Sequence, residues 1–198
     1  MNFKTSGKLA RATIAATVLF TAAQLALAQA APQVKFTTSA GSFVVEVYPD
    51  KAPKTVENFL QYVKDKHYDG TIFHRVIANF MVQGGGFDAN YQQRPTRAPV
   101  VHEGRQAFDK GLRNTNGTLA MARTNDPQSA TAQFFINVKE NAFLDPSAQA
   151  PGYTVFGKVI SGMDVVNTIK AVPTGPGGPF GSDVPKTPLL INSATLVK

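Results

Sequence analysis

The stretch "FHRVIANFMVQGGG", residues 73–86, indicates how this chain folds. Two runs of aromatic and aliphatic residues flank Ala78-Asn79, and this pattern predicts two antiparallel strands joined by a tight turn. Arg75 is the only Lys, Arg, Asp or Glu in the stretch. Because successive side chains of a strand point to opposite faces, Met81 shares a face with Gln83. One face of this hairpin is therefore predicted to present a guanidinium, a thioether and an amide together.

Outward from this hairpin, six more runs of β-branched and aromatic residues predict short strands. They lie at residues 34–38, 42–47, 118–122, 134–138, 154–160 and 189–197. Eight short strands without regular alternation of strand and helix predict an all-β, mainly β domain: a closed eight-stranded antiparallel β-barrel. Large strand residues such as Phe36 and Phe134 predict a filled interior, which argues against a barrel that carries a small ligand inside, as lipocalins do.

Two α-helices are predicted to cap this barrel. Pro53 suits a first helical position, and the apolar residues that follow it repeat with helical spacing. A second helix is predicted near residues 163–170, and Pro173 prevents its continuation. Residues 84–117, rich in Gly, Pro, Arg, Asn and Gln, predict a long irregular excursion, and residues 175–179 predict a rigid loop.

The N-terminus has the pattern of a secretory signal peptide. Three basic residues precede an apolar run from Ala12 to Ala28, which closes on a small-x-small pattern. We expect residues 1–28 to be cleaved, or residues 1–30 if the next such pattern is used, leaving one domain over residues 31–198. The alternative is an uncleaved anchor, but this run is short and interrupted by polar residues, whereas a spanning helix needs about 20 apolar ones. After cleavage no membrane contact is expected.

Charge and cysteine content restrict the function further. The formal net charge is +7, but three of the 20 basic residues and none of the 13 acidic ones precede the cleavage site, so the remaining chain carries +4. Its basic residues are scattered, which argues against nucleic-acid binding. The chain has no cysteine, so disulfides, thiolate nucleophiles and cysteine-ligated zinc are excluded. An exported protein without disulfides is typical of a bacterial periplasm.

Common catalytic motifs are missing from the sequence. The histidines His67, His74 and His102 lack the spacing of metal ligands. The glycines at residues 84–86 are not followed by the Lys-Ser/Thr of a phosphate-binding loop, and no G-x-S-x-G elbow occurs. We therefore expect neither a metal nor a cofactor. On the residues alone, Arg75 is either a functional cation or a surface arginine beside a core strand.

Several segments together resemble the signature segments of cyclophilin-type peptidyl-prolyl cis-trans isomerases. In chain order they are "FHRVIANFMVQGGG", "GTLAMA", "AQFFIN", "NAFLD" and "YTVFGKV". The resemblance covers residues 34–198 and is to the bacterial periplasmic branch. It implies the same eight-stranded barrel and an isomerase that accelerates rotation about X-Pro bonds. Its implied partners are proline-containing unfolded or flexible polypeptides, including exported proteins that are folding.

The resemblance also implies roles for individual residues. Arg75 is the implied catalytic arginine. The walls of the proline pocket are assigned to Phe80, Met81, Phe135 and Leu144. The implied role of Gln83, and of the backbone around Ala122 and Arg123, is to align the main chain of the substrate. Gln133 is implied to support the site. Strand alternation alone does not place Phe80 beside Met81, because neighbours in a strand point to opposite faces.

Two positions differ from the eukaryotic pattern of this family. Phe143 stands where those enzymes have a tryptophan, and Tyr153 stands where they have a histidine, which implies weak cyclosporin binding. Arg123 stands where related enzymes often carry asparagine. We expect a monomer. The alternative to catalysis is a proline-binding chaperone or holdase that uses the same pocket without turnover.

Overall fold

The computed structural model describes Met1 and residues 30–197, so the predicted signal segment lies, apart from Met1, outside the described residues. The elements are β1 (Gln33–Thr38), β2 (Gly41–Val47), α1 (Pro53–Lys64), β3 (Thr71–Ile77), β4 (Met81–Asp88), α2 (Gly104–Asp109), β5 (Thr118–Met121), β6 (Phe134–Asn137), β7 (Val155–Ser161), α3 (Met163–Lys170), β8 (Thr174–Gly177), β9 (Phe180–Pro185) and β10 (Leu190–Leu196). Two 3-10 turns are η1 (Pro127–Ser129) and η2 (Ala142–Leu144). Within residues 30–197, no helix has the length and apolar character needed to cross a bilayer.

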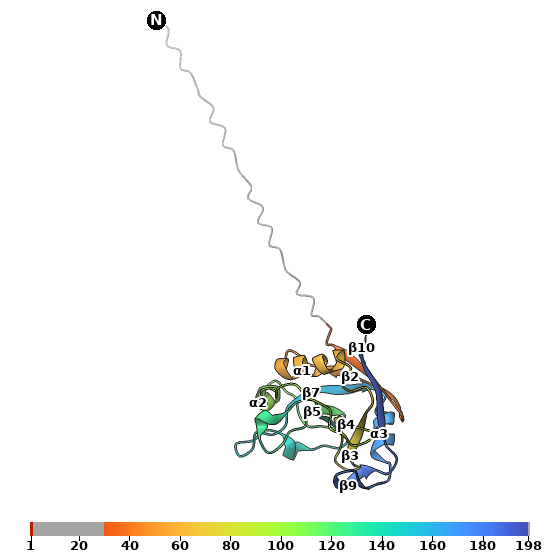
Figure 1. Ribbon diagram of the computed structural model, residues 1–198. Helices are drawn as coiled ribbons and strands as arrows, with labels where there is room; N and C mark the ends of the chain where they lie inside the picture. Colours follow the sequence, from red (N-terminus) through yellow and green to blue (C-terminus); the bar gives the residue numbers. More distant parts are fainter. Residues whose placement is uncertain (2–29, 198) are drawn as a thin grey trace.

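Eight of the strands form a closed antiparallel barrel in the order β1-β10-β3-β4-β6-β5-β7-β2. Figure 1 shows the helices α1, α2 and α3 around the strands. Strand β1 closes it, because it pairs with β2 along one edge and with β10 along the other. Closure leaves none of these strands with an unpaired edge. The eight-stranded barrel predicted from the sequence is confirmed.

Aromatic rings fill the interior of the barrel. Phe36 and Phe43 face each other across β1 and β2, with ring centroids 5.1 Å apart. Phe59 of α1 packs 5.1 Å from Phe156 of β7 and 6.1 Å from Phe134 of β6, so the apolar stripe of α1 covers the barrel. All five rings are buried. Because the interior is filled by side chains, a binding site has to lie on the outer face of the barrel.

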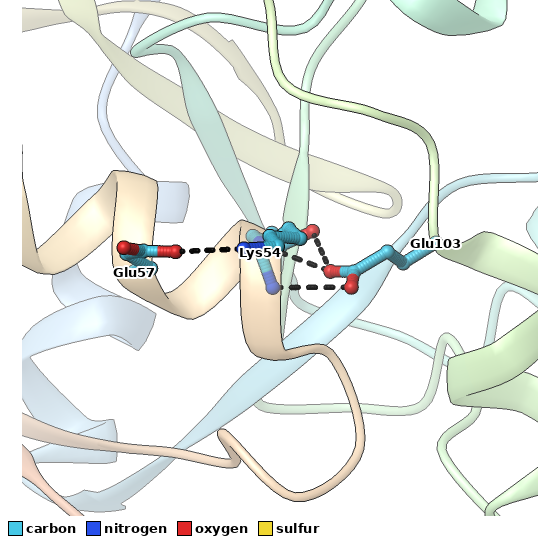
Figure 2. A network of polar contacts seen from close by, with 4 residues as sticks. Lys54, Glu57 and Glu103 are labelled. Carbon is cyan, nitrogen blue, oxygen red and sulfur yellow. Dashed lines mark hydrogen bonds and ion pairs between the residues drawn. The ribbon is translucent and has the colours of Figure 1, made fainter.

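Glu103 caps helix α1 from a distant part of the chain. Ala52 precedes the helix and offers no side-chain cap. Instead, the Glu103 carboxylate accepts hydrogen bonds from the backbone N–H of Lys54 at 3.1 Å and from the backbone N–H and hydroxyl of Thr55 at 2.8 and 2.7 Å (Figure 2). Glu103 is only 7% exposed. The buried carboxylate satisfies donors that the first helical turn leaves free, and its negative charge suits the helix dipole.

The excursion at residues 84–117 is more regular than expected. Strand β4 extends to Asp88, and α2 lies within the excursion, so residues 30–197 contain three α-helices instead of the predicted two. Helix α2 has six residues and begins at a glycine. It is too short to show the apolar repeat by which a helix is identified in a sequence.

The predicted loop at residues 175–179 also differs, because it lies in a hairpin, β8–β9, which forms a separate two-stranded sheet. Glycine and proline are depleted in strands, so its sequence does not indicate strands. Tertiary contacts hold it instead: the ring of Phe180 packs 5.1 Å from Phe87 and 5.4 Å from His74 of the barrel.

Replacing Glu103 with glutamine is expected to lower the free energy of unfolding by about 1–3 kcal/mol, because buried donors lose a charged acceptor. Urea unfolding of the two proteins measures this difference. Glu57→Gln is the matched control, since the Glu57 side chain is 74% exposed and its carboxylate contacts Nζ of Lys54 at 3.4 Å (Figure 2). We expect the control to change stability by no more than about 0.5 kcal/mol. Equal stability of Glu103→Gln and the unchanged protein would contradict the capping role.

Candidate functional site

A hollow of ≈ 330 Å³ lies on the face of β3, β4 and β6 that points away from the barrel core. Ten of the eleven residues singled out from the sequence line it: Arg75, Phe80, Met81, Gln83, Ala122, Arg123, Phe135, Phe143, Leu144 and Tyr153. The eleventh, Gln133, lines a neighbouring hollow. The fold thus brings together residues that come from five separate segments of the chain.

Strand register sets the polar groups of this hollow in a row. Arg75 of β3 pairs with Gln83 of β4, and Gln83 pairs with Phe135 of β6. The Gln83 side chain donates from Nε2 to Oε1 of Gln133 at 3.0 Å, which fixes the orientation of its amide. Met81 pairs with Ile77 further along the same two strands. A guanidinium, an amide and an aromatic ring therefore lie side by side across three strands.

The walls of the hollow form an apolar cluster that is separate from the barrel core. Met81 and Phe135 are buried in it. Phe80 lies in the turn between β3 and β4, outside the strand alternation, so it lines the hollow together with its neighbour Met81. Phe143 is 73% exposed and stacks on Phe80, with ring centroids 5.6 Å apart. The result is an apolar socket with an aromatic rim.

A network of buried amides holds the two loops that form this socket. Asn141 donates from Nδ2 to the carbonyl of Phe80 at 2.9 Å and to Oδ1 of Asn137 at 2.7 Å. Asn137 in turn donates to Oδ1 of Asn114 at 3.2 Å, and the backbone N–H of Leu144 donates to the Asn141 carbonyl at 2.8 Å. All three asparagines are buried. The network joins the Phe80 turn to the Leu144 turn, so the socket depends on satisfied polar groups as well as on packing.

Sequence reasoning missed this network. Its one signal in the sequence is an asparagine that ends the apolar run "FFIN" at Asn137. An amide in an otherwise buried strand needs hydrogen-bond partners, but the sequence does not say which residues supply them.

Arg123 separates the socket from the neighbouring hollow of ≈ 260 Å³. Its guanidinium donates to the carbonyls of Gly152 and Thr124, each at 2.8 Å, and lies 4.4 Å from the ring centroid of Tyr153. The neighbouring hollow is lined mostly by polar residues: Gln83, Gln93, Ala122, Arg123, Thr124, Ser129, Thr131 and Gln133. A chain whose apolar group occupies the socket can therefore extend over a polar surface.

The chemistry available at this site is binding and hydrogen-bond donation. Among residues 30–197, no group of three or more His, Cys, Asp or Glu side chains is placed to share a metal ion. Arg75 offers five N–H donors in a fixed plane. The site can hold a small apolar ring and direct donors at the polar atoms next to it.

His74 lies directly before Arg75 and is only 3% exposed. Its ring packs 4.8 Å from that of Phe87, and its Nδ1 has no hydrogen-bond partner among the described residues. Burial, with a smaller contribution from the positive charge of Arg75, lowers the pKa of His74 to about 4. At neutral pH the imidazole is therefore uncharged, and β3 presents its positive charge at Arg75.

Comparison with known proteins identifies a matching family. Residues 33–196 match the model of the cyclophilin type peptidyl-prolyl cis-trans isomerase family. The chain is 57% identical over 167 residues to peptidyl-prolyl cis-trans isomerase cyp18 of Streptomyces antibioticus, a match that covers 83% of this chain and 98% of that protein. It is 51% identical over 166 residues to peptidyl-prolyl cis-trans isomerase B of Escherichia coli, covering 82% and 98%.

The fold is also similar to that of a solved structure. A cyclophilin type peptidyl-prolyl cis-trans isomerase of Cryptosporidium parvum superimposes with a TM-score of 0.65 at 23% sequence identity. This match covers 85% of the present chain and 98% of the other. At this identity the likeness concerns the fold alone.

The low pKa of His74 predicts that stability depends on pH. Above the unfolded pKa of 6.5 the His74 imidazole is neutral in both the folded and the unfolded protein. Below 6.5 the imidazole binds a proton in the unfolded chain but stays neutral in the folded protein. Stability is therefore expected to fall between pH 6.5 and about 4, by about 3 kcal/mol for this residue. Urea unfolding of the unchanged protein and of His74→Phe, from pH 7.5 to 4.5, measures the difference. Parallel pH profiles for the two proteins would refute this prediction.

Proposed function

The chain belongs to the family of cyclophilin-type peptidyl-prolyl cis-trans isomerases, and from this premise we propose that the hollow around Arg75 is its active site. The protein is an enzyme that accelerates rotation about the peptide bond before proline. One observation carries the assignment of the site: the guanidinium of Arg75 and the apolar socket around Phe135 share one hollow.

The reaction explains why so few polar groups suffice. Resonance gives the X-Pro bond partial double-bond character, so its rotation faces a barrier of about 18–20 kcal/mol. A barrier of about 20 kcal/mol corresponds to roughly 0.01 events per second. No bond is broken, so neither a nucleophile nor a proton transfer is required. In the twisted transition state the nitrogen loses amide resonance and regains its lone pair.

Arg75 is proposed to stabilise this twisted state. A donor aimed at the proline nitrogen binds the transition state more strongly than the planar ground state, and only such differential binding accelerates the reaction. The planar guanidinium can also donate to the substrate carbonyl through a second N–H. Lysine, with a single mobile ammonium group, is a poor replacement.

The apolar socket is proposed to hold the proline ring while the rest of the chain turns. Phe80, Met81, Phe135 and Leu144 enclose a space that suits a small ring. Gln83, held by Gln133, is proposed to bind the substrate backbone together with the backbone at Ala122 and Arg123. A related fold, that of the Cryptosporidium parvum enzyme, has been solved in the presence of the dipeptide Ala-Pro, which supports X-Pro peptides as substrates.

The cellular role is proposed to be the folding of exported proteins in a bacterial periplasm. The support is the basic and apolar pattern that precedes Ala28, together with the absence of cysteine from the chain. The relatives compared above include bacterial isomerases. We propose that residues 1–28, or 1–30, are removed on export and that the enzyme belongs to the periplasmic branch.

Arg75→Ala is expected to reduce isomerase activity about 100-fold or more, because the transition state loses a charged donor. Exchange NMR on an Ala-Pro-Phe-type peptide measures the activity and, in the same samples, peptide binding. Arg75→Lys should remain far below the unchanged enzyme. Arg105→Ala on α2 is the matched control, since Arg105 is exposed and pairs with Asp109 within its own helix, and it should retain full activity.

If the wild-type protein binds the peptide but does not accelerate its isomerisation, this result would point instead to a proline-binding chaperone. Full activity in Arg75→Ala would contradict the role of Arg75 while leaving the family assignment in place.

Export is tested by expressing the whole chain in a Gram-negative bacterium and fractionating the cells. We expect a periplasmic protein whose intact mass and N-terminal sequence begin at Gln29 or Ala31. A protein that keeps Met1 and stays in the cytoplasmic fraction would exclude the proposed signal peptide.

A further inference from the structure

We propose that Asp183, on the β8–β9 hairpin, is a positioning residue for the guanidinium of Arg75. This inference rests on the proposed role of Arg75 and concerns a residue that nothing in the sequence singled out. It means that the hairpin outside the barrel belongs to the catalytic apparatus.

The β8–β9 hairpin forms one wall of a cleft that is also lined by Arg75. Strand β9 packs on β3, the strand that carries Arg75. Between hairpin and barrel lies a hollow of ≈ 580 Å³, lined by His74, Arg75, Gln83, Phe87, Arg123, Gln133 and the hairpin residues 179–183. Arg75 lines both this hollow and the proline socket. Its guanidinium therefore stands between two open spaces, where packing alone does not restrict its direction.

Asp183 supplies the missing restraint. Its Oδ2 lies 3.9 Å from Nε of Arg75, and the two side chains are 36% and 46% exposed. Among the described residues this is the ion pair that Arg75 makes. A free arginine side chain samples many rotamers, and ordering it in the twisted transition state, where it is proposed to donate to the proline nitrogen, costs free energy. A carboxylate on the Nε side reduces that cost and leaves the terminal N–H groups for the substrate.

The backbone of Asp183 is itself held in an unusual conformation. Its φ is +63°, in the left-handed region that non-glycine residues seldom adopt. The next residue, Val184, is buried and pairs with Gly175 of β8, and Phe180 anchors the start of β9 in the aromatic cluster with His74. Aspartate tolerates this conformation better than most residues, and left-handed residues cluster at functional sites, where a side chain has to be aimed. Here it directs the carboxylate at Arg75.

The test uses Asp183→Asn, because asparagine also tolerates a positive φ and has nearly the same shape as aspartate. Exchange NMR on a capped, uncharged Ala-Pro-Phe-type peptide over a range of concentrations gives kcat and KM separately. We expect kcat to fall about 2- to 5-fold with KM unchanged, as befits an exposed ion pair that acts on the transition state. Asp109→Asn is the matched control, since it removes a carboxylate that pairs with an arginine on α2. Its kcat should not change.

Salt dependence separates the electrostatic role from a structural one. The Debye length falls from about 10 Å at 0.1 M salt to about 3 Å at 1 M. The kcat of the unchanged enzyme should therefore fall toward that of Asp183→Asn as salt is raised, whereas the kcat of the variant should stay constant. Equal kcat values and equal salt profiles would overturn the proposal.

A double-mutant cycle distinguishes failure of this inference from failure of the proposed site. If Asp183 acts through Arg75, then Asp183→Asn has no further effect on the residual activity of Arg75→Ala. The same fold-loss in both backgrounds would show a structural role and overturn the inference. A normal rate in Arg75→Ala would overturn the proposed function itself, and the inference with it.

Discussion

Closure of the barrel is the constraint on which the rest of this structure depends. Strand β1 pairs with both β2 and β10, so every strand of the barrel has two neighbours. A small closed barrel needs large side chains inside it, and the rings of Phe36, Phe59 and Phe134 meet that need. With the interior full, the only faces left for chemistry are the outward sides of the strands and the loops that cover them.

The position of the proposed active site follows from the filled interior, because the site has to lie on the outside of the barrel. The outward side of β3, β4 and β6 carries Arg75, Gln83 and Phe135 in one cross-strand row. A second apolar cluster lies beyond the core, and the loops complete it as the proposed socket for a proline ring. Because loops lack the backbone ladder of a sheet, buried asparagine side chains such as Asn141 fix their position. The rigid barrel thus orients the polar row, and hydrogen-bonded loops shape the socket.

The catalytic demand of this reaction is small, and the proposed site answers it with a small number of groups. Rotation about a peptide bond needs differential binding of a twisted amide and no transfer of atoms. The Arg75 guanidinium offers several N–H donors in a fixed plane, and its neighbour His74 stays neutral because burial lowers the pKa of His74 to about 4. The guanidinium also has to be held in the right orientation. The β8–β9 hairpin contributes to this, because it brings Asp183 to the side of Arg75 that faces away from the socket.

Strand and helix patterns in the sequence were enough to predict the barrel, α1 and α3, because alternation and the 3.6-residue repeat are local properties. The likeness of short motifs to a known family was enough to name candidate site residues such as Phe80, which alternation alone does not place beside Met81. Helix α2 and the β8–β9 hairpin were missed, since a six-residue helix and a run of Gly and Pro carry no periodic signal. The cap of α1 by Glu103, the asparagine network and the approach of Asp183 to Arg75 were decided by tertiary structure alone. Each joins polar groups that lie far apart in the chain, and a sequence records which groups need partners but not which ones the fold brings within reach.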